Sequence, residues 1–314
     1  MITDHFDGRR FFNPSAPALQ PFSSVPRMLL ERREPWPAHI DVPPRMPPPL
    51  GDAAAVCTFI GHATFLIQTP AGNLITDPMF SDRAGPFNAL GPRRVRPPAI
   101  RLRDLPSIAV VLLSHNHYDH CDRPSLRALA RRFDPLVVTP KGNAPLVRST
   151  GVRRIAELDW WESIAAGSLS IVATRAHHFS ARTPLDRNRA LWGGFAVSVG
   201  GARIYFAGDT AYAPFFRDLR TRVGPIDLAL LPIGAYEPRW FMRSVHMNPA
   251  EAVQAHLDLA PARSIGMHLR TFQLTTEGID EPVRALAEAR RAAGIADEAF
   301  TVLDFGDSVT VGCT

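Results

Sequence analysis

The stretch Leu112-Leu-Ser-His-Asn-His-Tyr-Asp-His-Cys-Asp122 places three histidines and two aspartates directly after an apolar run. Within it, His115, His117, Asp119 and His120 form an H-x-H-x-D-H pattern, and each of these side chains can offer a lone pair to a divalent metal. Four ligands so close together cannot enclose one tetrahedral ion and leave a position open, but they can divide between two adjacent ions. The stretch therefore predicts a two-metal centre that takes further ligands from elsewhere in the chain.

The flanking residues predict that this cluster lies on a loop between a strand and a helix. Residues 108–113 are apolar at every position, which is typical of a strand covered on both faces. Beyond the cluster, Leu126, Leu129 and Phe133 recur at helical spacing, with Asp122 as the predicted N-cap. Ligands on such a loop are held by a rigid scaffold and remain open to substrate.

The rest of the chain alternates β-rich runs with turns, and its second half repeats the pattern of the first. The predicted strand pair 194–199 and 203–207 ends in Asp209, as an earlier pair ends in Asp77. Residues 227–232 then echo the apolar run before the cluster. Such symmetry indicates an α/β (α+β) chain with two β-rich halves and helices outside, a four-layer αββα sandwich. The other predicted elements are strands over 56–60, 63–69 and 73–76, a last helix over 281–293 and a final strand at about 300–304.

Proline content divides the chain into two segments. Residues 1–50 are crowded with proline, which disfavours both helix and central strand, so we expect them to form an extended arm. The apolar side chains of this arm are expected to pack on the domain formed by residues 51–314. A partner or a lipid surface is the alternative.

Composition limits the class of protein. A hydrophobic content of 46% over 314 residues excludes a disordered chain. The net charge of +5 and the pI of about 9.6 favour an anionic substrate, although an ordinary basic surface gives the same values. No stretch approaches the roughly 18 apolar residues of a spanning helix, and prolines interrupt the segment after Arg9-Arg10 that resembles an export signal. Three widely spaced cysteines exclude a disulfide framework, so we expect a cytoplasmic protein, at most peripheral to a membrane.

Further candidate ligands follow other predicted strands. They are His177-His178 after residues 169–174, Asp209 after 203–207, and His268 after 264–267. Taken singly, each could be a hydrogen-bonded structural histidine or an aspartate making a turn. Because all of them follow strand ends, as the H-x-H-x-D-H cluster does, we expect them to converge on one rim of the sandwich.

These features resemble the metallo-β-lactamase-fold hydrolases, in which H-x-H-x-D-H is followed by His, Asp and His on successive strand-end loops. Within that superfamily, several motifs are similar to those of the N-acyl-phosphatidylethanolamine-hydrolysing phospholipase D family. They are Gly61-His-Ala-Thr64, Thr76-Asp-Pro78, Ser114-His-Asn-His-Tyr-Asp-His120, Glu157-Leu-Asp-Trp-Trp161, Phe206-Ala-Gly-Asp-Thr210 and Pro232-Ile-Gly-Ala-Tyr-Glu-Pro-Arg-Trp-Phe-Met242. The likeness runs over residues 56–305, and the last motif is long enough to point to this family.

The resemblance implies a centre of two zinc ions, for which other divalent transition metals could substitute. The implied ligands are His115, His117 and His178 for the first ion and Asp119, His120 and His268 for the second, with Asp209 bridging. His178 is preferred over His177 because the family's histidine precedes an aromatic residue, here Phe179, while His177 stays an alternative. Two adjacent divalent ions lower the pKa of a shared water to about 7 and clamp phosphoryl oxygens. Asp119 would orient that water and accept its proton.

His246 is predicted to line the site just ahead of a helix. Asn248 caps this helix, Pro249 takes its first position and Glu251 completes a capping-box pattern. An anionic group bound there would meet both the imidazole and the positive end of the helix. A histidine that merely packs the cap is the alternative from the residues alone, and the family resemblance favours a catalytic role.

Other residues are expected to support the site. Asp77 is interpreted as an acceptor that orients a ligand histidine from behind, with a turn residue before Pro78 as the alternative. Tyr236 and Arg270 are expected to contact the substrate, and Arg270 stands where the family has a small residue. The histidines without a recognisable constellation are expected to be structural or exposed: His5, His39, His62 and His256.

The predicted function is that of a zinc-dependent phosphodiesterase of phospholipase D type, acting on N-acyl-phosphatidylethanolamine-like phospholipids. The ligand set alone indicates only metal-assisted hydrolysis, so a lactonase or other carboxylic-ester hydrolase is the alternative, favoured if residues 236–242 line a small polar pocket. A metal-binding protein without turnover is a third interpretation. No basic stripe with interleaved aromatic residues indicates a nucleic-acid partner, whereas a homodimer is compatible with the sequence.

Overall fold

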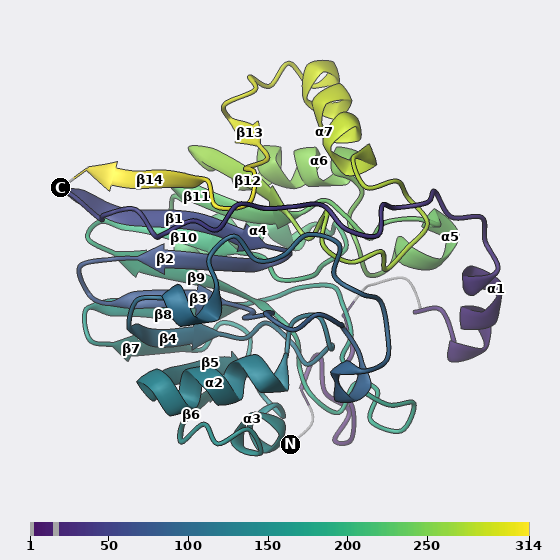
Figure 1. Ribbon diagram of the computed structural model, residues 1–314, viewed down its shortest axis with the longest axis horizontal. Coiled ribbons are helices and arrows are strands. Elements are labelled where there is room, and N and C mark those ends of the chain that lie inside the picture. The colour runs from purple at the N-terminus through teal and green to yellow at the C-terminus, as the bar shows by residue number, and fades with distance from the viewer. Residues whose placement is uncertain (1–2, 15–18, 314) are drawn as a thin grey trace.

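The computed structural model describes residues 3–14 and 19–313, and within them the chain forms two seven-stranded sheets and seven α-helices (Figure 1). The first sheet has the strand order β14 (Ser308–Cys313), β1 (Ala53–Gly61), β2 (Thr64–Gln68), β3 (Asn73–Thr76), β4 (Ile108–Leu112), β5 (Leu136–Pro140) and β6 (Arg154–Leu158). The second has the order β13 (Phe300–Thr301), β12 (Arg263–Met267), β11 (Leu228–Pro232), β10 (Ala202–Phe206), β9 (Gly194–Val199), β8 (Leu169–Thr174) and β7 (Ser163–Ala166).

The two sheets repeat one another strand by strand. Read from β14, the first sheet has three antiparallel pairings followed by three parallel ones. Read from β7, the second sheet has the same succession. The hairpin before each change of direction ends in an aspartate, Asp77 after β3 and Asp209 after β10. The repeat predicted from the sequence is thus confirmed.

Helices cover the outer faces of both sheets. Helices α2 (Arg123–Phe133) and α3 (Ala144–Arg148) pack on the first sheet, and α4 (Phe215–Val223), α6 (Pro249–Leu259) and α7 (Glu281–Ala292) lie on the side of the second (Figure 1). The four-residue α5 (Arg239–Met242) belongs to the loop after β11. The four-layer αββα sandwich predicted from the sequence is confirmed.

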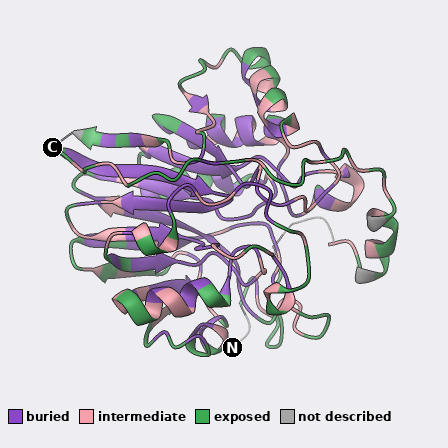
Figure 2. Ribbon diagram, viewed as in Figure 1, coloured by how far each residue is buried: buried purple, intermediate pink, exposed green. Residues whose placement is uncertain are grey.

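The inner faces of the two sheets share one core. Phe65 and Leu74 from the first sheet belong to the same buried cluster as Phe195 and Ile204 from the second. Burying a side chain of this size contributes about 1.5–3 kcal/mol, so this shared cluster holds the layers together. Figure 2 shows strands buried over most of their length and helices with exposed outer faces. The exception in the apolar run before the metal-ligand pattern is Ala109 of β4, which is exposed.

The end of the chain differs from the prediction. The final strand expected at about 300–304 is only the two-residue β13, and the last strand is β14. After a turn at residues 304–307, β14 crosses to the first sheet and pairs antiparallel with β1. Strand β14 alternates small polar residues with valine. It pairs with residues far away in the sequence: Thr58 of β1 and Ser308 of β14, whose hydroxyls form a hydrogen bond, are 250 positions apart. Local sequence does not reveal such a pairing.

The proline-rich segment follows the surface of the domain. Backbone amides of Glu34, Ile40 and Arg45 donate to carbonyls of Thr276, Val95 and Ala99 at 3.0, 2.9 and 2.8 Å. The expectation of no helix here is wrong at α1 (Val25–Leu29), because a proline in the first helical turn lacks only an amide that has no intrahelical partner. Within the described residues, no helix is long and apolar enough to cross a membrane.

Candidate metal centre

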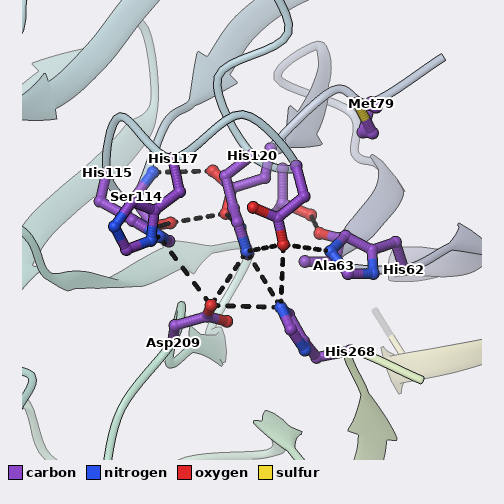
Figure 3. A network of polar contacts seen from close by, with 12 residues as sticks. His62, Ala63, Met79, Ser114, His115, His117, His120, Asp209 and His268 are labelled. Atoms are coloured by element: carbon purple, nitrogen blue, oxygen red, sulfur yellow. Dashed lines mark hydrogen bonds and ion pairs between the residues drawn. The ribbon is translucent and has the colours of Figure 1, made fainter. Parts of the chain in front are cut away.

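The predicted ligands meet where loops from the two sheets face each other (Figure 3). The loop after β4 in the first sheet and the loops after β8, β10 and β12 in the second supply His115, His117, Asp119, His120, His178, Asp209 and His268. All of these side chains except His117 are buried. In Figure 3, Asp209 and His268 approach from the side opposite to His115 and His120.

One group of ligand atoms consists of three imidazoles. Nε2 of His115 lies 2.9 Å from Nδ1 of His117, and Nε2 of His178 lies 3.1 Å from that same Nδ1. Nδ1 of His178 lies 2.9 Å from the carbonyl oxygen of Val245, so the ring donates there and its Nε2 is left free for a metal. Three ring nitrogens turned to one point form an arrangement that suits zinc.

The other group combines the carboxylate of Asp119 with the predicted ligands His120 and His268, and it also includes the imidazole of His62. Oδ2 of Asp119 lies 3.4 Å from Nε2 of His120 and 3.3 Å from Nε2 of His268. The two ring nitrogens are 3.1 Å apart. The backbone of His268 is in the left-handed region, with φ of 64°, and its amide donates to the carbonyl of His62.

Asp209 lies between the two groups. Its Oδ2 is 3.0 Å from Nε2 of His120 and 3.1 Å from Nε2 of His268. The same oxygen is 3.9 Å from Nε2 of His115 and 3.8 Å from Nε2 of His178. Among the described residues, Oδ1 of Asp209 is buried without a hydrogen-bond partner, which is costly for a carboxylate unless a cation binds it. This set of imidazole and carboxylate donors therefore fits divalent metal.

A glycine brings Asp209 close to the first sheet. Gly208 has a φ of +62°, and a Cβ at this position would lie 2.8 Å from the carbonyl oxygen of Gly193 and 2.8 Å from Cβ of Ser114. Any larger residue would push the Asp209 loop away from the loop of His115. The contact joins the two halves of the centre at the backbone level.

Asp77 and Ser114 support the ligands from behind. The fully buried carboxylate of Asp77 accepts hydrogen bonds from the Ser114 amide and hydroxyl at 2.7 and 2.5 Å and from Nδ1 of His120 at 2.6 Å. The Ser114 oxygen in turn lies 2.8 Å from Nδ1 of His115. This arrangement leaves the Nε2 of both histidines to face the metals.

Burial makes the imidazoles of the first group neutral. It lowers the pKa of His117 to about 3 and that of His178 to about 4, and it holds the pKa of His115 well below its usual value. Neutral imidazole is the form that binds a metal. At neutral pH the first group is therefore ready to act as a ligand set.

The second group holds protons that a metal must displace. Burial alone would lower the pKa of His268, but Asp209 and Asp119 raise it to about 9. Burial is likewise outweighed for His120, whose pKa lies well above its usual value because of Asp209, Asp119 and Asp77. The same histidines keep the pKa of Asp209 well below its usual range although burial alone would raise it. Metal binding to this group thus releases protons.

His246 faces both groups from the second sheet. It is 6% exposed, and its Nε2 lies 3.8 Å from Oδ2 of Asp209. Its ring centroid is 5.0 Å from that of His178 and 5.2 Å from that of His268. The predicted capping box of Asn248 and Glu251 begins α6 just after it. Among the described residues, Nδ1 of His246 is buried without a partner.

The long motif at residues 232–242 holds the His246 loop in place. The carboxylate of Glu277 accepts hydrogen bonds from the backbone amides of Ala235 and Tyr236, at 2.6 and 3.3 Å. Arg239 donates to the carbonyl of His246 at 3.0 Å and to the carboxylate of Glu251 at 2.7 Å. The motif is therefore a scaffold for the second half of the site.

The polar groups of the two predicted substrate-binding residues are bound to other side chains. The hydroxyl of Tyr236 donates to Glu281 at 3.1 Å, and burial together with Glu281 raises the pKa of this phenol. The guanidinium of Arg270 pairs with Asp280 at 2.7 Å. A role of either residue in substrate binding stays a prediction.

The geometry separates the neighbours His177 and His178. His178 belongs to the first group, whereas the ring of His177 packs near Phe215 with centroids 5.4 Å apart. Successive residues after β8 point to opposite sides, so only one of the two can reach the centre. Cys121, beside the H-x-H-x-D-H pattern, is fully buried in the apolar core under α2, and burial raises its pKa to about 12.

His62 was missed by the sequence analysis. The expectation that it joins no constellation is wrong, because its Nε2 lies 2.9 Å from Oδ2 of Asp119 and its side chain is buried. Burial lowers the pKa of His62 to about 3. Its place in the Gly61-His-Ala-Thr64 motif was the available signal. His256, by contrast, is structural as expected and contacts Ser264.

Comparison with known proteins agrees with this site. Residues 72–269 match a family model described as a beta-lactamase superfamily domain. N-acyl-phosphatidylethanolamine-hydrolyzing phospholipase D 1 of Caenorhabditis elegans is 36% identical over 271 residues, which cover 82% of this chain and 76% of that protein. The chain belongs to the metallo-β-lactamase superfamily. Within this superfamily, it is a member of the family that includes the nematode protein.

Other known proteins are similar over much of the chain. An uncharacterized protein of Mycobacterium tuberculosis is 40% identical over 245 residues, 76% of this chain, and the chain spans only 65% of its length. The yeast N-acyl-phosphatidylethanolamine-hydrolyzing phospholipase D, mitochondrial, is 36% identical over 77% of this chain and 53% of its own. The isothiocyanate hydrolase from Delia radicum gut bacteria shares the fold, with a TM-score of 0.67 and 22% identity over 82% of this chain and all of that one.

Proposed function

We propose that this protein is a metal-dependent phosphodiesterase that hydrolyses N-acyl-phosphatidylethanolamine-like phospholipids at a two-zinc centre. The observation that carries the proposal is the position of Asp209 Oδ2 between two buried groups of ligand atoms. Held by these groups, two divalent ions would supply hydroxide at neutral pH and would stabilise a charged phosphoryl group. The phospholipid substrate is carried over from the nematode and yeast relatives.

The residues of the chain have separate tasks in this reaction. Asp119 would orient the attacking water and accept its proton, since it is a carboxylate whose oxygen belongs to the second group. His246 binds the anionic phosphoryl group beside the amino end of α6. The loops that carry these residues are held from behind by Asp77 and Arg239.

An apolar cavity next to the site favours a lipid over a small polar ester. The volume of this cavity is about 140 Å³. Two of its lining residues are next to His178: Phe179 follows it in the sequence, and the carbonyl of Val245 accepts a hydrogen bond from its ring. The other lining residues are Leu19, Gln20, Val25, Met28, Arg187, Phe241 and Ser244. Phe241 belongs to residues 236–242, the region expected to line a small polar pocket in a lactonase. Here Phe241 lines an apolar cavity instead. An acyl chain fits such a lining.

We propose that the loops at 80–91 and 181–187 contact a lipid surface. Phe87 is 93% exposed and Leu185 is 80% exposed. Phe87 and Arg182 line a cavity of about 380 Å³ together with Tyr118 of the ligand loop. Apolar tips beside a guanidinium and close to the metal site suit the headgroup region of an anionic bilayer.

Vesicle sedimentation tests this contact. The double variant Phe87→Ser with Leu185→Ser should bind less to vesicles that contain phosphatidylglycerol, while hydrolysis of a water-soluble phosphate bis-ester stays at the wild-type rate. Met46→Ser is the matched control, because Met46 is 71% exposed in the proline-rich segment. Unchanged vesicle binding of the double variant would exclude these loops as the contact.

Metal content and substrate range test the function itself. The purified protein should contain two equivalents of zinc and hydrolyse an N-acyl phosphatidylethanolamine presented in detergent. A carboxylic-ester or lactone hydrolase is the second candidate, because the same ligand set would activate water against a carbonyl. Two equivalents of metal with turnover of lactones only would overturn the phospholipid substrate. Metal without turnover of any ester would indicate a protein that only binds metal.

A further inference from the structure

His62 occupies the turn between β1 and β2, directly beside the second ligand group. The side chain is 1% exposed, and its Nε2 lies 2.9 Å from Oδ2 of Asp119. This oxygen is the atom of Asp119 that faces Nε2 of His120 and Nε2 of His268. His62 therefore contacts the oxygen of Asp119 that faces the two candidate ligand histidines.

The backbone of His62 supports the same group. Its carbonyl accepts the amide of His268 at 2.8 Å, and the two rings lie 4.2 Å apart. His62 has a φ of 58°, a left-handed conformation that is unfavourable for a non-glycine residue and persists only where surrounding contacts enforce it. The preceding residue is glycine because a Cβ there would lie 2.7 Å from the ring of Phe305. The turn is built to hold His62 in this place.

The geometry distinguishes a supporting role from a ligand role. By distance, His62 is a fourth member of the group formed by Asp119, His120 and His268. Nε2 of His120 and Nε2 of His268 also lie 3.0 and 3.1 Å from Oδ2 of Asp209, whereas Nε2 of His62 contacts Asp119, to which it donates a hydrogen bond because a carboxylate oxygen only accepts. Nδ1 of His62 is buried and, among the described residues, has no partner. The ring thus makes one hydrogen bond, and that bond goes to a candidate ligand.

We propose that His62 is a positioning residue of the second metal site. Its Nε2 fixes Oδ2 of Asp119, and its carbonyl fixes the strand end that carries His268. The proposal rests on the two-metal centre of the proposed function. It assigns to Gly61-His-Ala-Thr64 a task in setting the affinity of one of the two metals.

Metal titration of His62 variants tests the proposal without relying on activity. Zinc binding is followed by competition with a chromogenic chelator, in the wild type, His62→Ala and His62→Gln. Loss of a hydrogen bond to a ligand commonly weakens metal binding by about 10–100-fold, so we expect that loss for the weaker of the two zinc steps in His62→Ala and an unchanged tighter step. His62→Gln should recover most of the affinity, because its amide N–H reaches the position of the Nε2–H. His256→Gln, a change at a buried histidine outside the site, should leave both steps unchanged.

Each other outcome is decisive. Equal affinities of the wild type and His62→Ala, or equal losses at both steps, would overturn the proposal. A His62→Gln variant as weak as His62→Ala would show that the hydrogen bond is not the cause. If His62→Ala does not fold, His62→Asn replaces it, because asparagine tolerates the left-handed backbone but its shorter amide cannot reach Asp119. A wild type that fails to bind two zinc ions would instead contradict the proposed function.

Discussion

Nδ1 of His120 donates a hydrogen bond of 2.6 Å to Oδ2 of Asp77, and both side chains are fully buried. Through Ser114, the same carboxylate also governs the orientation of His115. His115 belongs to the first ligand group and His120 to the second, so one buried acid at the end of β3 orients a histidine in each half of the centre. Such hydrogen bonds set both the ring orientation and the basicity of a ligand.

Asp77→Asn should therefore weaken both metal sites. The asparagine amide has the same size as the carboxylate, but its NH2 group must face either Ser114 or His120. An NH2 group cannot accept the hydrogen bond that this residue donates to Asp77. We expect a loss of about 10–100-fold in zinc affinity, measured by chelator competition. Asp258→Asn is the control, because Asp258 is a largely buried carboxylate that pairs with Tyr212 and Arg217 away from the centre. Unchanged zinc affinity of Asp77→Asn would contradict the orienting role.

Removal of a direct ligand should abolish metal and turnover together. His115→Ala takes one nitrogen from the first group, and Asp209→Asn replaces the oxygen that lies between both groups. We expect both variants to lose at least one metal equivalent, measured by elemental analysis, and to fall to background hydrolysis. Full metal content and full activity in both would exclude this cluster as the active site.

His246→Ala should separate metal binding from turnover. The ring faces Asp209 at 3.8 Å and lies within ligand distance of Asp209 and His178, but it belongs neither to the group of His115, His117 and His178 nor to that of Asp119, His120 and His268. We expect wild-type metal content and a fall in kcat of about 10²–10⁴-fold, the range of a group that acts on protons or charge in the transition state. A large loss of metal in this variant would make His246 a ligand instead.

The metal-free protein should be most stable near pH 6.5. The pKa of His117 is lowered to about 3 and that of His178 to about 4, so below about pH 6.5 the unfolded chain binds more protons than the folded one, and stability falls with falling pH. The pKa of His268 is raised to about 9. Its contribution to the free energy of unfolding is therefore complete below about pH 6.5 and is lost as the pH rises through 9.

Thermal unfolding in the presence of a chelator measures this profile. Midpoints at about pH 5 and about pH 9 should both lie below the midpoint at about pH 6.5. The loss at the alkaline end should be smaller in His268→Ala, where His120 alone of this pair still contributes it. Added zinc should raise the midpoint most at the alkaline end, where fewer protons must be displaced. A midpoint that rises steadily from pH 6.5 to pH 9 would contradict the assigned pairing of His268 with Asp209.

Local sequence was sufficient for most of the scaffold. The apolar run of β4, the helical spacing of α2 and the capping box of α6 each depend on residues close in the chain, and their positions agree with the prediction. The sequence also predicted that histidines from both halves lie close together, because each of them follows the end of a predicted strand. The choice between His177 and His178 needed the direction of each side chain after β8.

What the sequence by itself determined is the αββα sandwich and the set of residue types on its rim, since these follow from periodicity and from the H-x-H-x-D-H pattern. Tertiary structure alone decided which side chains share a hydrogen bond. His62 meets Asp119 from 57 positions away, and Arg270, which was predicted to contact the substrate, pairs with Asp280. Such pairings depend on how strand ends from two sheets approach one another in the folded core, and no spacing along the chain encodes that distance.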